Sequence, residues 1–386
     1  MIAGSKCASI GNRYSHCEGS GIYLFCRTKA EIRSTPPHHE RGVTTALSDN
    51  VQSVYYNSLG SSKHLYDTIL QSIRNGSRMI PIAGPVNANE LVTQVFFDHP
   101  ELFFATPGHG TVVSLLGSAI TPFYPYSQAE ASRLKAQLES VSDQIIHELI
   151  NDHQSDYDKV RVLHDYLKYN LQYDNDAVGS LPVTREFAEA HNIVGALLHH
   201  KCVCDGFSKA FKYLCNKAGV ECWVIHGKGS SSIGSEFHAW NIVKINGYYH
   251  HVDVTWDNQY AASALIPNYG YLNLSDEEIS KDHTWNRKHY PACPDSPYNY
   301  FRVNDSLIDS KTQLINFLRR NIQMEEAVIM FRVVRGSPLE KEVMGCLDDC
   351  IYRASANNKY VSITSWQHQY IPEQLTHMIE PTYILR

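Results

Sequence analysis

Long apolar runs are missing from this 386-residue chain, and their absence narrows where the protein acts. No stretch approaches the about 20 apolar residues that a membrane-spanning helix needs. Residues 1–20 also lack a basic segment followed by an apolar one, the pattern of a secretory signal. We therefore expect a cytoplasmic location and no membrane contact, with a lost leader or secretion by another route left open.

Positive charge is also sparse. The chain carries 34 basic and 40 acidic residues, a net charge of −6, without a dense basic patch. Nucleic-acid-binding proteins neutralise phosphates with clustered Lys and Arg, so we expect no nucleic-acid partner. Hydrophobic content of 43% and charged content of 19% are typical of a soluble globular protein.

A regular cysteine framework is absent. The ten cysteines are scattered in a chain long enough to build its own core, which favours free thiols in a reducing compartment. Cys7, Cys17 and Cys26, with His16, are spaced poorly for a metal site. We expect neither a metal ion nor an organic cofactor.

The length favours two or three domains, and changes in composition suggest where they divide. Residues 1–45 are rich in Gly, Ser, Thr, Pro and His and are expected to be a poorly ordered lead-in. The predicted fold class is α+β, with a small N-terminal α/β region over 46–125 and a central core over 126–300. Residues 301–386 are expected to form a small C-terminal α/β domain of structural or interaction character.

Apolar periodicity and capping signals predict the secondary structure. The box Ser127–Glu130 opens a long helix. A second helix over 156–171 should pack against the helix that follows Cys204, with Lys159 facing water. The Gly/Ser-rich segment 227–234 is predicted to be a mobile loop. Further helices are expected at 62–75, after Ser310 and at 338–355, and strands at 102–105, 111–116, 221–227, 237–245, 327–334 and 360–365.

Cys204 stands at the start of a predicted amphipathic helix. Apolar residues recur at helical spacing from Phe207 to Ala218, and Gly219 stands where the helix would stop. A thiol at a helix N-terminus lies near unpaired N–H groups and the positive end of the helix dipole, which stabilise a thiolate. The same N–H groups suit an oxyanion in acyl transfer. Taken alone, the pattern also fits an inert buried cysteine.

A predicted hairpin brings a histidine and a carboxylate together. Asn246-Gly247 is the preferred pair for a two-residue type I′ turn, so the strand before it should return along 248–257. In that register His238 lies opposite Thr255 and diagonal to Asp253. The carboxylate can then orient the imidazole and leave its other nitrogen for a thiol.

Three motifs, in this order and spacing, resemble the transglutaminase-like superfamily, of the bacterial transglutaminase-like or cysteine-peptidase type. They are Val203-Cys204-Asp205-Gly206-Phe207, His238-Ala239-Trp240-Asn241 and Asp253-Val254-Thr255-Trp256-Asp257. Segments 163–167, 173–174, 193–197, 271–276 and 283–285 extend the resemblance over about residues 155–300. It implies a papain-like core, with a cysteine helix packed on an antiparallel sheet, and a Cys204–His238–Asp253 triad. Cys202, where the family often has glycine, is a second candidate thiol.

The resemblance implies a cysteine-dependent enzyme that acts on amide bonds in peptides or proteins. Cys204 attacks the carbonyl, His238 accepts the thiol proton and later protonates the leaving amine, and Asp253 orients His238. The residues expected to bind substrate are Trp240, Trp256 and Tyr173. The two tryptophans also fit plain core packing.

Three outcomes remain open at the level of function. Hydrolysis, as in a protease or amidase, ranks first, because the resemblance implies that many bacterial members are hydrolytic. Resolution of the acyl-enzyme by an amine, which crosslinks Gln to Lys, ranks second. A non-catalytic peptide-binding module on the same scaffold ranks third. Cys204, His238 and Asp253 are all present, and a module that only binds peptides would not require all three.

Overall fold

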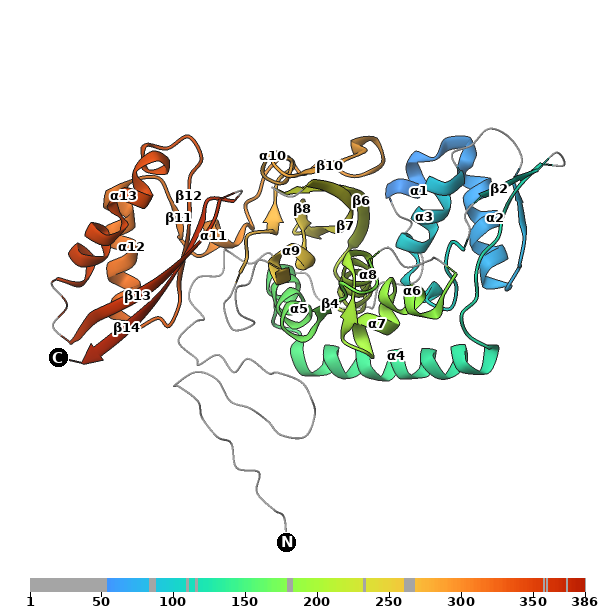
Figure 1. Ribbon diagram of the computed structural model, residues 1–386, viewed down its shortest axis with the longest axis horizontal. Coiled ribbons are helices and arrows are strands. Elements are labelled where there is room, and N and C mark those ends of the chain that lie inside the picture. The colour runs from blue at the N-terminus through green and yellow to red at the C-terminus, as the bar shows by residue number, and fades with distance from the viewer. Residues whose placement is uncertain are drawn as a thin grey trace, which may run out of the picture.

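The computed structural model describes residues 54–82, 88–108, 111–114, 117–178, 183–231, 234–259, 268–356, 358, 360–372 and 374–385. The lead-in expected over 1–45 lies outside these residues. An N-terminal group of elements, a central core and a C-terminal group lie side by side along the long axis (Figure 1). Within the described ranges, no helix combines the length and apolarity needed to cross a bilayer.

The N-terminal group packs helices beside a three-stranded antiparallel sheet of order β1-β3-β2. Its elements are α1 (Val54–Ser58), η2 (Gly60–Ser62), α2 (Lys63–Arg74), β1 (Ile80–Ile82), α3 (Ala88–Asp98), η3 (Pro100–Leu102), β2 (Thr111–Ser114) and β3 (Gly117–Ile120). The helix predicted over 62–75 is confirmed. The strand predicted over 102–105 is wrong, because Pro100 opens a 3-10 turn.

Helices form one side of the central core. They are α4 (Gln128–Leu149), α5 (Asp156–Asn170), α6 (Arg185–Ala190), α7 (Ile193–Leu197) and α8 (Cys204–Lys217), joined by the parallel pair β4 (Gln172–Tyr173) and β5 (Lys201–Cys202). The capping box Ser127–Glu130 opens α4, and α5 packs on α8, both as predicted. Lys159 does not face water. It is buried, and its Nζ donates to the Ala218 carbonyl, which the end of α8 leaves open.

A five-stranded antiparallel sheet of order β10-β6-β7-β8-β9 packs on these helices. Its strands are β6 (Cys222–Ser231), β7 (Gly234–Ile245), β8 (Tyr248–Val252), β9 (Leu272–Leu274) and β10 (His283–Trp285). Asn246 and Gly247 have φ of 49° and 88°, as a type I′ turn requires. Ile245 pairs with Tyr248, so the predicted register of the hairpin is confirmed over β8.

The returning strand is shorter than predicted. It ends at Val252, and Thr255 lies in helix α9 (Val254–Gln259) instead of opposite His238. The physical cause is Asp253. Its Oδ1 accepts the Trp256 N–H at 3.1 Å and so satisfies one of the open donors in the first turn of the helix.

The segment 227–234 is not the loop that its Gly and Ser content predicted. It continues β6 to Ser231, and residues 232–233 lie outside the described ranges. Gly229 explains the composition, because a Cβ there would lie 2.7 Å from Trp256 and 3.4 Å from His238. Glycine lets the strand pass close over these two side chains.

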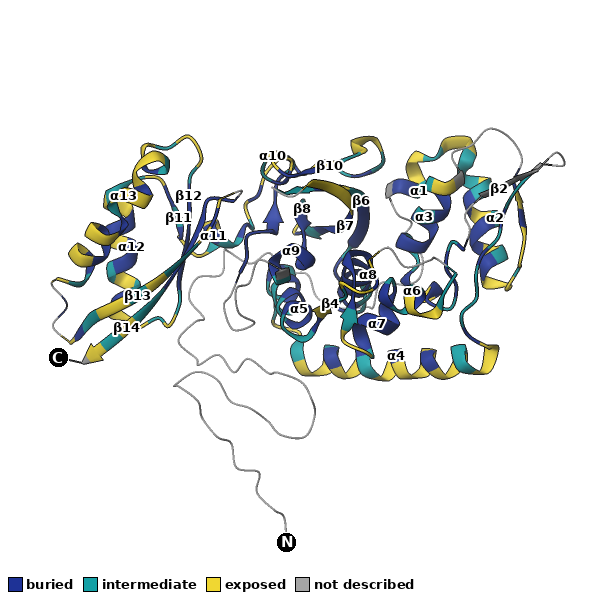
Figure 2. Cartoon of the chain, viewed as in Figure 1, coloured by how far each residue is buried: buried dark blue, intermediate teal, exposed yellow. Residues whose placement is uncertain are grey.

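Most of the central sheet is buried, apart from the end formed by Gly234–Phe237 of β7 and the last residues of β6 (Figure 2). Val243 and Val252 point into a core shared with α5 and α8. Trp223, Ile225 and Trp240 point into a second core shared with the N-terminal helices. The predicted α+β class, with the cysteine helix packed on an antiparallel sheet, is confirmed.

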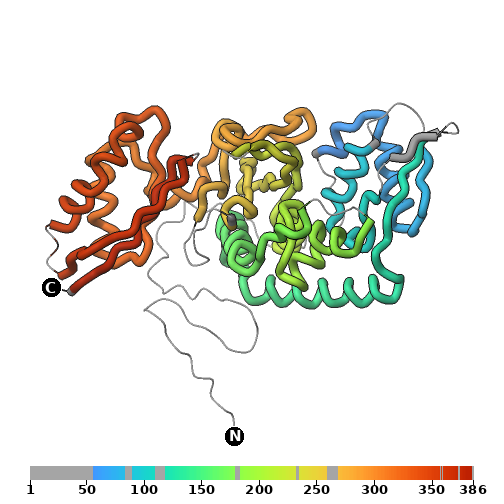
Figure 3. The backbone as a smooth tube through the Cα atoms, viewed as in Figure 1, coloured from blue at the N-terminus to red at the C-terminus, as the bar shows by residue number. Residues whose placement is uncertain are grey.

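The C-terminal group packs two helices on a four-stranded sheet of order β11-β12-β14-β13 (Figure 3). In the chain, α10 (Asp276–Ile279) stands between β9 and β10, η4 (Arg287–His289) follows β10 and contacts α1, and α11 (Tyr300–Val303) precedes the C-terminal group. The group contains β11 (Leu307–Ile308), α12 (Lys311–Gln323), β12 (Ile329–Val333), α13 (Pro338–Ser355), β13 (Val361–Ile371) and β14 (Thr376–Leu385). The predicted helices and the two predicted strands are confirmed, although β13 runs six residues beyond the predicted end at 365. Strand β14 was not predicted. Pro381 is tolerated in it because β12 pairs only as far as Ile379, and β13 is the neighbour beyond.

Candidate active site

Cys204 is the first residue of α8. The preceding Val203 is extended, and its N–H donates to the Ala190 carbonyl, which anchors the start of the helix. Gly206 allows the close approach of α8 to β5, because a Cβ there would lie 2.6 Å from Cys202 Cβ. The Cys204 residue is 9% exposed, so its thiol lies at the edge of the core rather than on the open surface.

Cys202, the second candidate thiol, lies in a different environment. It is completely buried at the end of β5. Burial, with the negative charge of nearby Asp205, raises the pKa of the Cys202 thiol well above its ordinary value. A buried thiol with a raised pKa is a poor nucleophile. The geometry therefore favours Cys204 over Cys202.

His238 and Asp253 lie in hydrogen-bonding contact. His238 comes from β7 and Asp253 from the junction of β8 and α9, and His238 Nε2 donates to Asp253 Oδ2 at 2.6 Å. The structure therefore brings together the pair that the hairpin register predicted. Helix α9 takes the place of the predicted strand residues 254–257 without separating the two side chains.

The second nitrogen of His238 is left for the thiol. Nε2 is already taken by Asp253, and Cys204 lies close enough to the imidazole to help raise its pKa. Burial by itself would lower the pKa of His238. The charge and hydrogen bond of Asp253, helped by Cys204, outweigh burial and raise the pKa to about 9. The imidazolium form is therefore favoured at neutral pH.

Asp253 is fully buried and stays ionised. Burial would raise the pKa of its carboxyl, but the charge of His238 and hydrogen bonds from His238 and His283 lower it well below its usual range. His283 belongs to a motif that the sequence singled out, yet no role was predicted for it. Its Nε2 lies 3.1 Å from Asp253 Oδ2 and its Nδ1 lies 2.6 Å from Asp282 Oδ1.

The three residues predicted to bind substrate lie at different depths. Trp240 is completely buried behind His238, with ring centroids 5.9 Å apart, and Trp256 packs 5.4 Å from the same imidazole. Both tryptophans therefore form the apolar wall that holds His238. Tyr173 is half-buried. Burial and the nearby Cys204 raise the pKa of its phenol, which keeps the hydroxyl protonated and able to donate.

The N-terminal group contributes to the surroundings of the thiol. Phe97 of α3 packs in one small apolar cluster with Cys204, Val224 and Ala239. Phe237, one residue before His238, is 57% exposed. The thiol thus has an apolar wall supplied by a distant part of the chain, and an exposed aromatic side chain lies beside its histidine.

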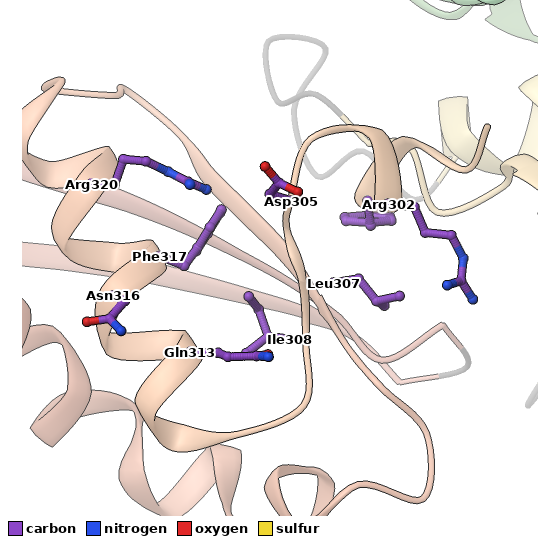
Figure 4. A pocket seen from close by; sticks show the side chains of 9 residues that line it. Arg302, Asp305, Leu307, Ile308, Gln313, Asn316, Phe317 and Arg320 are labelled. Atoms are coloured by element: carbon purple, nitrogen blue, oxygen red, sulfur yellow. The ribbon is translucent and has the colours of Figure 1, made fainter. Parts of the chain in front are cut away.

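A surface hollow lies elsewhere, where α11, β11 and α12 meet (Figure 4). It encloses about 500 Å³. Its lining residues are Phe301, Arg302, Asp305, Leu307, Ile308, Gln313, Asn316, Phe317 and Arg320. None of the residues around Cys204 takes part in it, so the hollow is separate from the candidate active site.

Two groups of side chains in the described ranges have ligand-type atoms within 4.8 Å of one another. They are His238, Asp253 and His283, and His251, Asp276 and Cys293. In the second group, Trp240 donates its indole N–H to His251 Nδ1 at 3.1 Å. His251 Nε2 must then carry the ring proton, which it donates to Asp276 at 2.8 Å. Hydrogen bonding accounts for this arrangement, and a metal ion at Nε2 would have to displace that proton.

Residues 143–254 match the profile of the family described as the transglutaminase-like superfamily. The matched segment contains Cys204, His238 and Asp253. The resemblance drawn from the three motifs is confirmed for this part of the chain.

Two curated relatives match a similar share of the chain. Kyphoscoliosis peptidase of Mus musculus is 27% identical over 139 residues, and that of Homo sapiens is 29% identical over 122 residues. These matches cover 34% and 30% of this chain. The chain spans only 20% and 18% of the relatives' length.

Two solved structures also match in part. One is a candidate cysteine protease from Cytophaga hutchinsonii, with 16% identity and a TM-score of 0.24, over 36% of this chain and 51% of the other. The second is a TGase, with 16% identity and a TM-score of 0.26, over 46% and 50%. At such values neither structure supports a conclusion about activity.

Proposed function

Because residues 143–254 carry a transglutaminase-like core, we propose that this protein is a cysteine-dependent acyl-transfer enzyme that hydrolyses amide bonds in peptides or proteins. The observation that carries the proposal is the arrangement around His238. Its Nε2 donates to Asp253 Oδ2 at 2.6 Å, and Cys204, the first residue of α8, lies close enough to the same imidazole to help raise its pKa. A thiol, an imidazole and a buried carboxylate in this order are the parts of a nucleophilic triad.

In the proposed reaction the Cys204 thiolate attacks the amide carbonyl carbon. The tetrahedral intermediate collapses when the His238 imidazolium gives its proton to the departing amine, which leaves an acyl-enzyme and a neutral imidazole. His238 then takes a proton from water as the water oxygen attacks the thioester. The carboxylic acid product leaves, and the thiolate–imidazolium pair is restored. Asp253 stabilises the imidazolium at both stages.

Negative charge on the tetrahedral oxygen needs donors. The N–H groups in the first turn of α8 have no acceptor within the helix, and they lie at the positive end of its dipole. We propose the Cys204 N–H as one such donor. Burial and the charge of Cys204 raise the pKa of the half-buried Tyr173 phenol, and its hydroxyl is the side-chain group that we propose as a substrate contact.

Hydrolysis is proposed ahead of transamidation. The two curated relatives are named peptidases, which supports a peptide or protein substrate. The alternative is attack by a lysine amine on the acyl-enzyme, which requires that water be kept out. A non-catalytic peptide-binding module is the second alternative, and the combination of the His238–Asp253 contact with a cysteine at the first position of α8 argues against it.

The test of the proposal is the rate of iodoacetamide alkylation of Cys204 against pH, read separately from Cys202 by peptide mass spectrometry. The wild-type thiol should react well below the pH of about 8.5 at which a free thiol titrates. His238→Ala should abolish this acidic limb, while Cys202 stays unreactive in both proteins. An ordinary or buried-thiol profile at Cys204 in both proteins would remove the enzyme hypothesis and leave the binding module.

Ammonia release separates the two enzymatic outcomes. A hydrolase of peptide bonds exposes new amino termini and is not stimulated by added amine. A transamidase acting on glutamine releases ammonia, and it incorporates an added amine such as a labelled cadaverine. Incorporation that depends on Cys204 would replace hydrolysis with transamidation.

A further inference from the structure

The carboxylate of Asp253 serves two histidines at once. Its Oδ2 accepts Nε2–H from His238 at 2.6 Å and Nε2–H from His283 at 3.1 Å. His283 is completely buried in β10, and its strand is paired with β6 beside the site. The proposed reaction uses only His238 for proton transfer, so His283 requires another explanation.

His283 faces a second carboxylate with its other ring nitrogen. Its Nδ1 lies 2.6 Å from Asp282 Oδ1. An ionised carboxylate only accepts hydrogen bonds, so both nitrogens of His283 must carry protons. The ring is then an imidazolium held between two aspartates. Burial would lower the pKa of His283, but the hydrogen bonds to Asp253 and Asp282 outweigh it and raise the pKa.

The surroundings of His283 supply no other cation that could replace it among the described residues. The titratable side chains that face it are His238, His251, Asp253, Asp282 and Tyr271. His251 is neutral, because its Nδ1 accepts from Trp240 and burial lowers its pKa. His238 is the proton carrier itself. His283 is therefore the fixed positive charge beside Asp253.

The C-terminal group reaches this network. Asp282 Oδ2 accepts hydrogen bonds from the Tyr271 hydroxyl at 2.7 Å and from Gln374 Nε2 at 3.2 Å. Gln374 is buried in the turn between β13 and β14. Nearby, buried Arg332 of β12 donates to the Gly270 carbonyl, which fastens the same sheet to the central core. Gln374 of the C-terminal group thus hydrogen-bonds Asp282, and Asp282 in turn hydrogen-bonds His283.

We propose that His283 is a positioning residue for the triad, and that Gln374 secures it from the C-terminal group. This inference rests on the proposed function. His283 fixes Asp253 in the orientation that meets His238, and its positive charge favours the Cys204 thiolate. The C-terminal group is then part of the working site rather than an appended domain.

His283→Gln tests the charge directly in the full-length chain. The His238 and His283 ring centroids are 5.3 Å apart, so removing the cation withdraws support from the thiolate and repulsion from the His238 imidazolium. In the profile of Cys204 alkylation rate against pH, the acidic limb reports ionisation of the thiol and the alkaline limb reports loss of the proton from His238. Both limbs should move to higher pH, by about 1 unit. A purely structural defect would lower the rate at every pH without moving either limb.

Gln374→Leu tests the link to the C-terminal group. The matched control is Gln367→Leu, because Gln367 is an exposed residue of β13. We expect Gln374→Leu to move both limbs upward by a few tenths of a unit, roughly a twofold change in rate on the acidic limb, and the control to superimpose on wild type. Limbs that stay at the wild-type pH in both His283→Gln and Gln374→Leu would overturn the inference.

A second measurement covers the case in which His283→Gln does not fold. Nitrogen-15 NMR of histidine-labelled wild-type protein should show both His283 ring nitrogens protonated at neutral pH, and a neutral ring would overturn the inference. A wild-type Cys204 alkylation profile without an acidic limb would instead refute the proposed function. The two failures are therefore distinguishable.

Discussion

Several buried histidine–aspartate contacts lie among the described residues, and two of them invite comparison because only one has the candidate nucleophile Cys204 beside it. His238 Nε2 donates to Asp253 at 2.6 Å, and His164 Nε2, on α5, donates to Asp257 at 2.9 Å. In both pairs burial lowers the histidine pKa, and carboxylates outweigh it and raise the pKa. The two histidine pKa values therefore shift in the same direction. The aspartates differ, because the charge and hydrogen bonds of His238 and His283 outweigh burial and lower the pKa of Asp253, whereas burial raises the pKa of Asp257.

The pairs differ in what faces the second ring nitrogen. His164 Nδ1 lies 3.4 Å from another carboxylate, Asp165, and the Asp257 Oδ1 accepts the Tyr271 N–H at 3.0 Å. That pair ties α5 to α9 and to the strand that follows. The comparison teaches that a buried histidine–aspartate contact is not by itself a sign of catalysis. The thiol at the third position makes the difference.

Replacing the Cys204 thiol, which distinguishes the two pairs, should have the largest effect on activity. Cys204→Ala should lower the rate of peptide hydrolysis by roughly 10³-fold or more, because the nucleophile is lost. Cys202→Ala is the control and should stay within about twofold, since its thiol is buried with a raised pKa. Mass spectrometry of a digested peptide library measures both. The reverse order of effects would make Cys202 the nucleophile.

Replacing the two histidines separates chemistry from stability. His238→Ala should remove the acidic limb of Cys204 alkylation. His164→Ala should leave that limb in place but lower the free energy of unfolding by about 3–5 kcal/mol, because Asp257 stays buried without its partner. Urea unfolding measures the second effect. If His164→Ala shifts the alkylation limb as far as His238→Ala does, the two pairs are not distinct.

The stability of the protein should decline on the alkaline side because of His238 and on the acid side because of Asp205. The folded pKa of His238 is raised from 6.5 to about 9, so its contribution is fully present below pH 6.5 and is lost as pH rises through about 9. On the acid side, burial would raise the pKa of Asp205, but His191 and Lys209 lower it from 3.8 to about 2. That contribution is lost as pH falls through about 2. Urea midpoints should decline in both windows, and an alkaline decline unchanged in His238→Ala would contradict this assignment.

The smallest effect is expected at the exposed aromatic residue next to His238. Phe237→Ser should change the free energy of unfolding by less than about 0.5 kcal/mol, because the side chain is mostly exposed. If Phe237 contacts substrate, KM should rise several-fold while kcat stays near the wild-type value. Steady-state kinetics on a peptide identified in the library digest would check this. A fall in kcat alone would place the effect on His238 instead.

The candidate triad could be predicted from sequence because local signals encode it. Asn246-Gly247 determines the turn, and the turn determines the register that brings His238 near Asp253. Gly219, with φ of 79°, ends the cysteine helix where predicted. Helix α9 was missed because its β-branched and aromatic residues are typical of a strand, whereas the capping contact of Asp253 decides the structure.

The wider network could not be predicted, because its contacts are remote along the chain. His283 meets Asp253 across 30 residues and Gln374 meets Asp282 across 92. No periodicity or spacing rule connects such positions. Lys159 shows the same limit. Its place on a helix surface predicted exposure, and only the packing of α5 on α8 turned it toward a backbone carbonyl.

The most direct test of the central claim is the ultraviolet absorbance of the thiolate, recorded against pH as the difference between wild type and Cys204→Ala. We expect a thiolate signal already present at pH 6, well below the pH of about 8.5 at which a free thiol ionises, and absent at that pH in His238→Ala. A difference signal that first rises above pH 8 in wild type would contradict a Cys204–His238 ion pair, and with it the proposed enzyme.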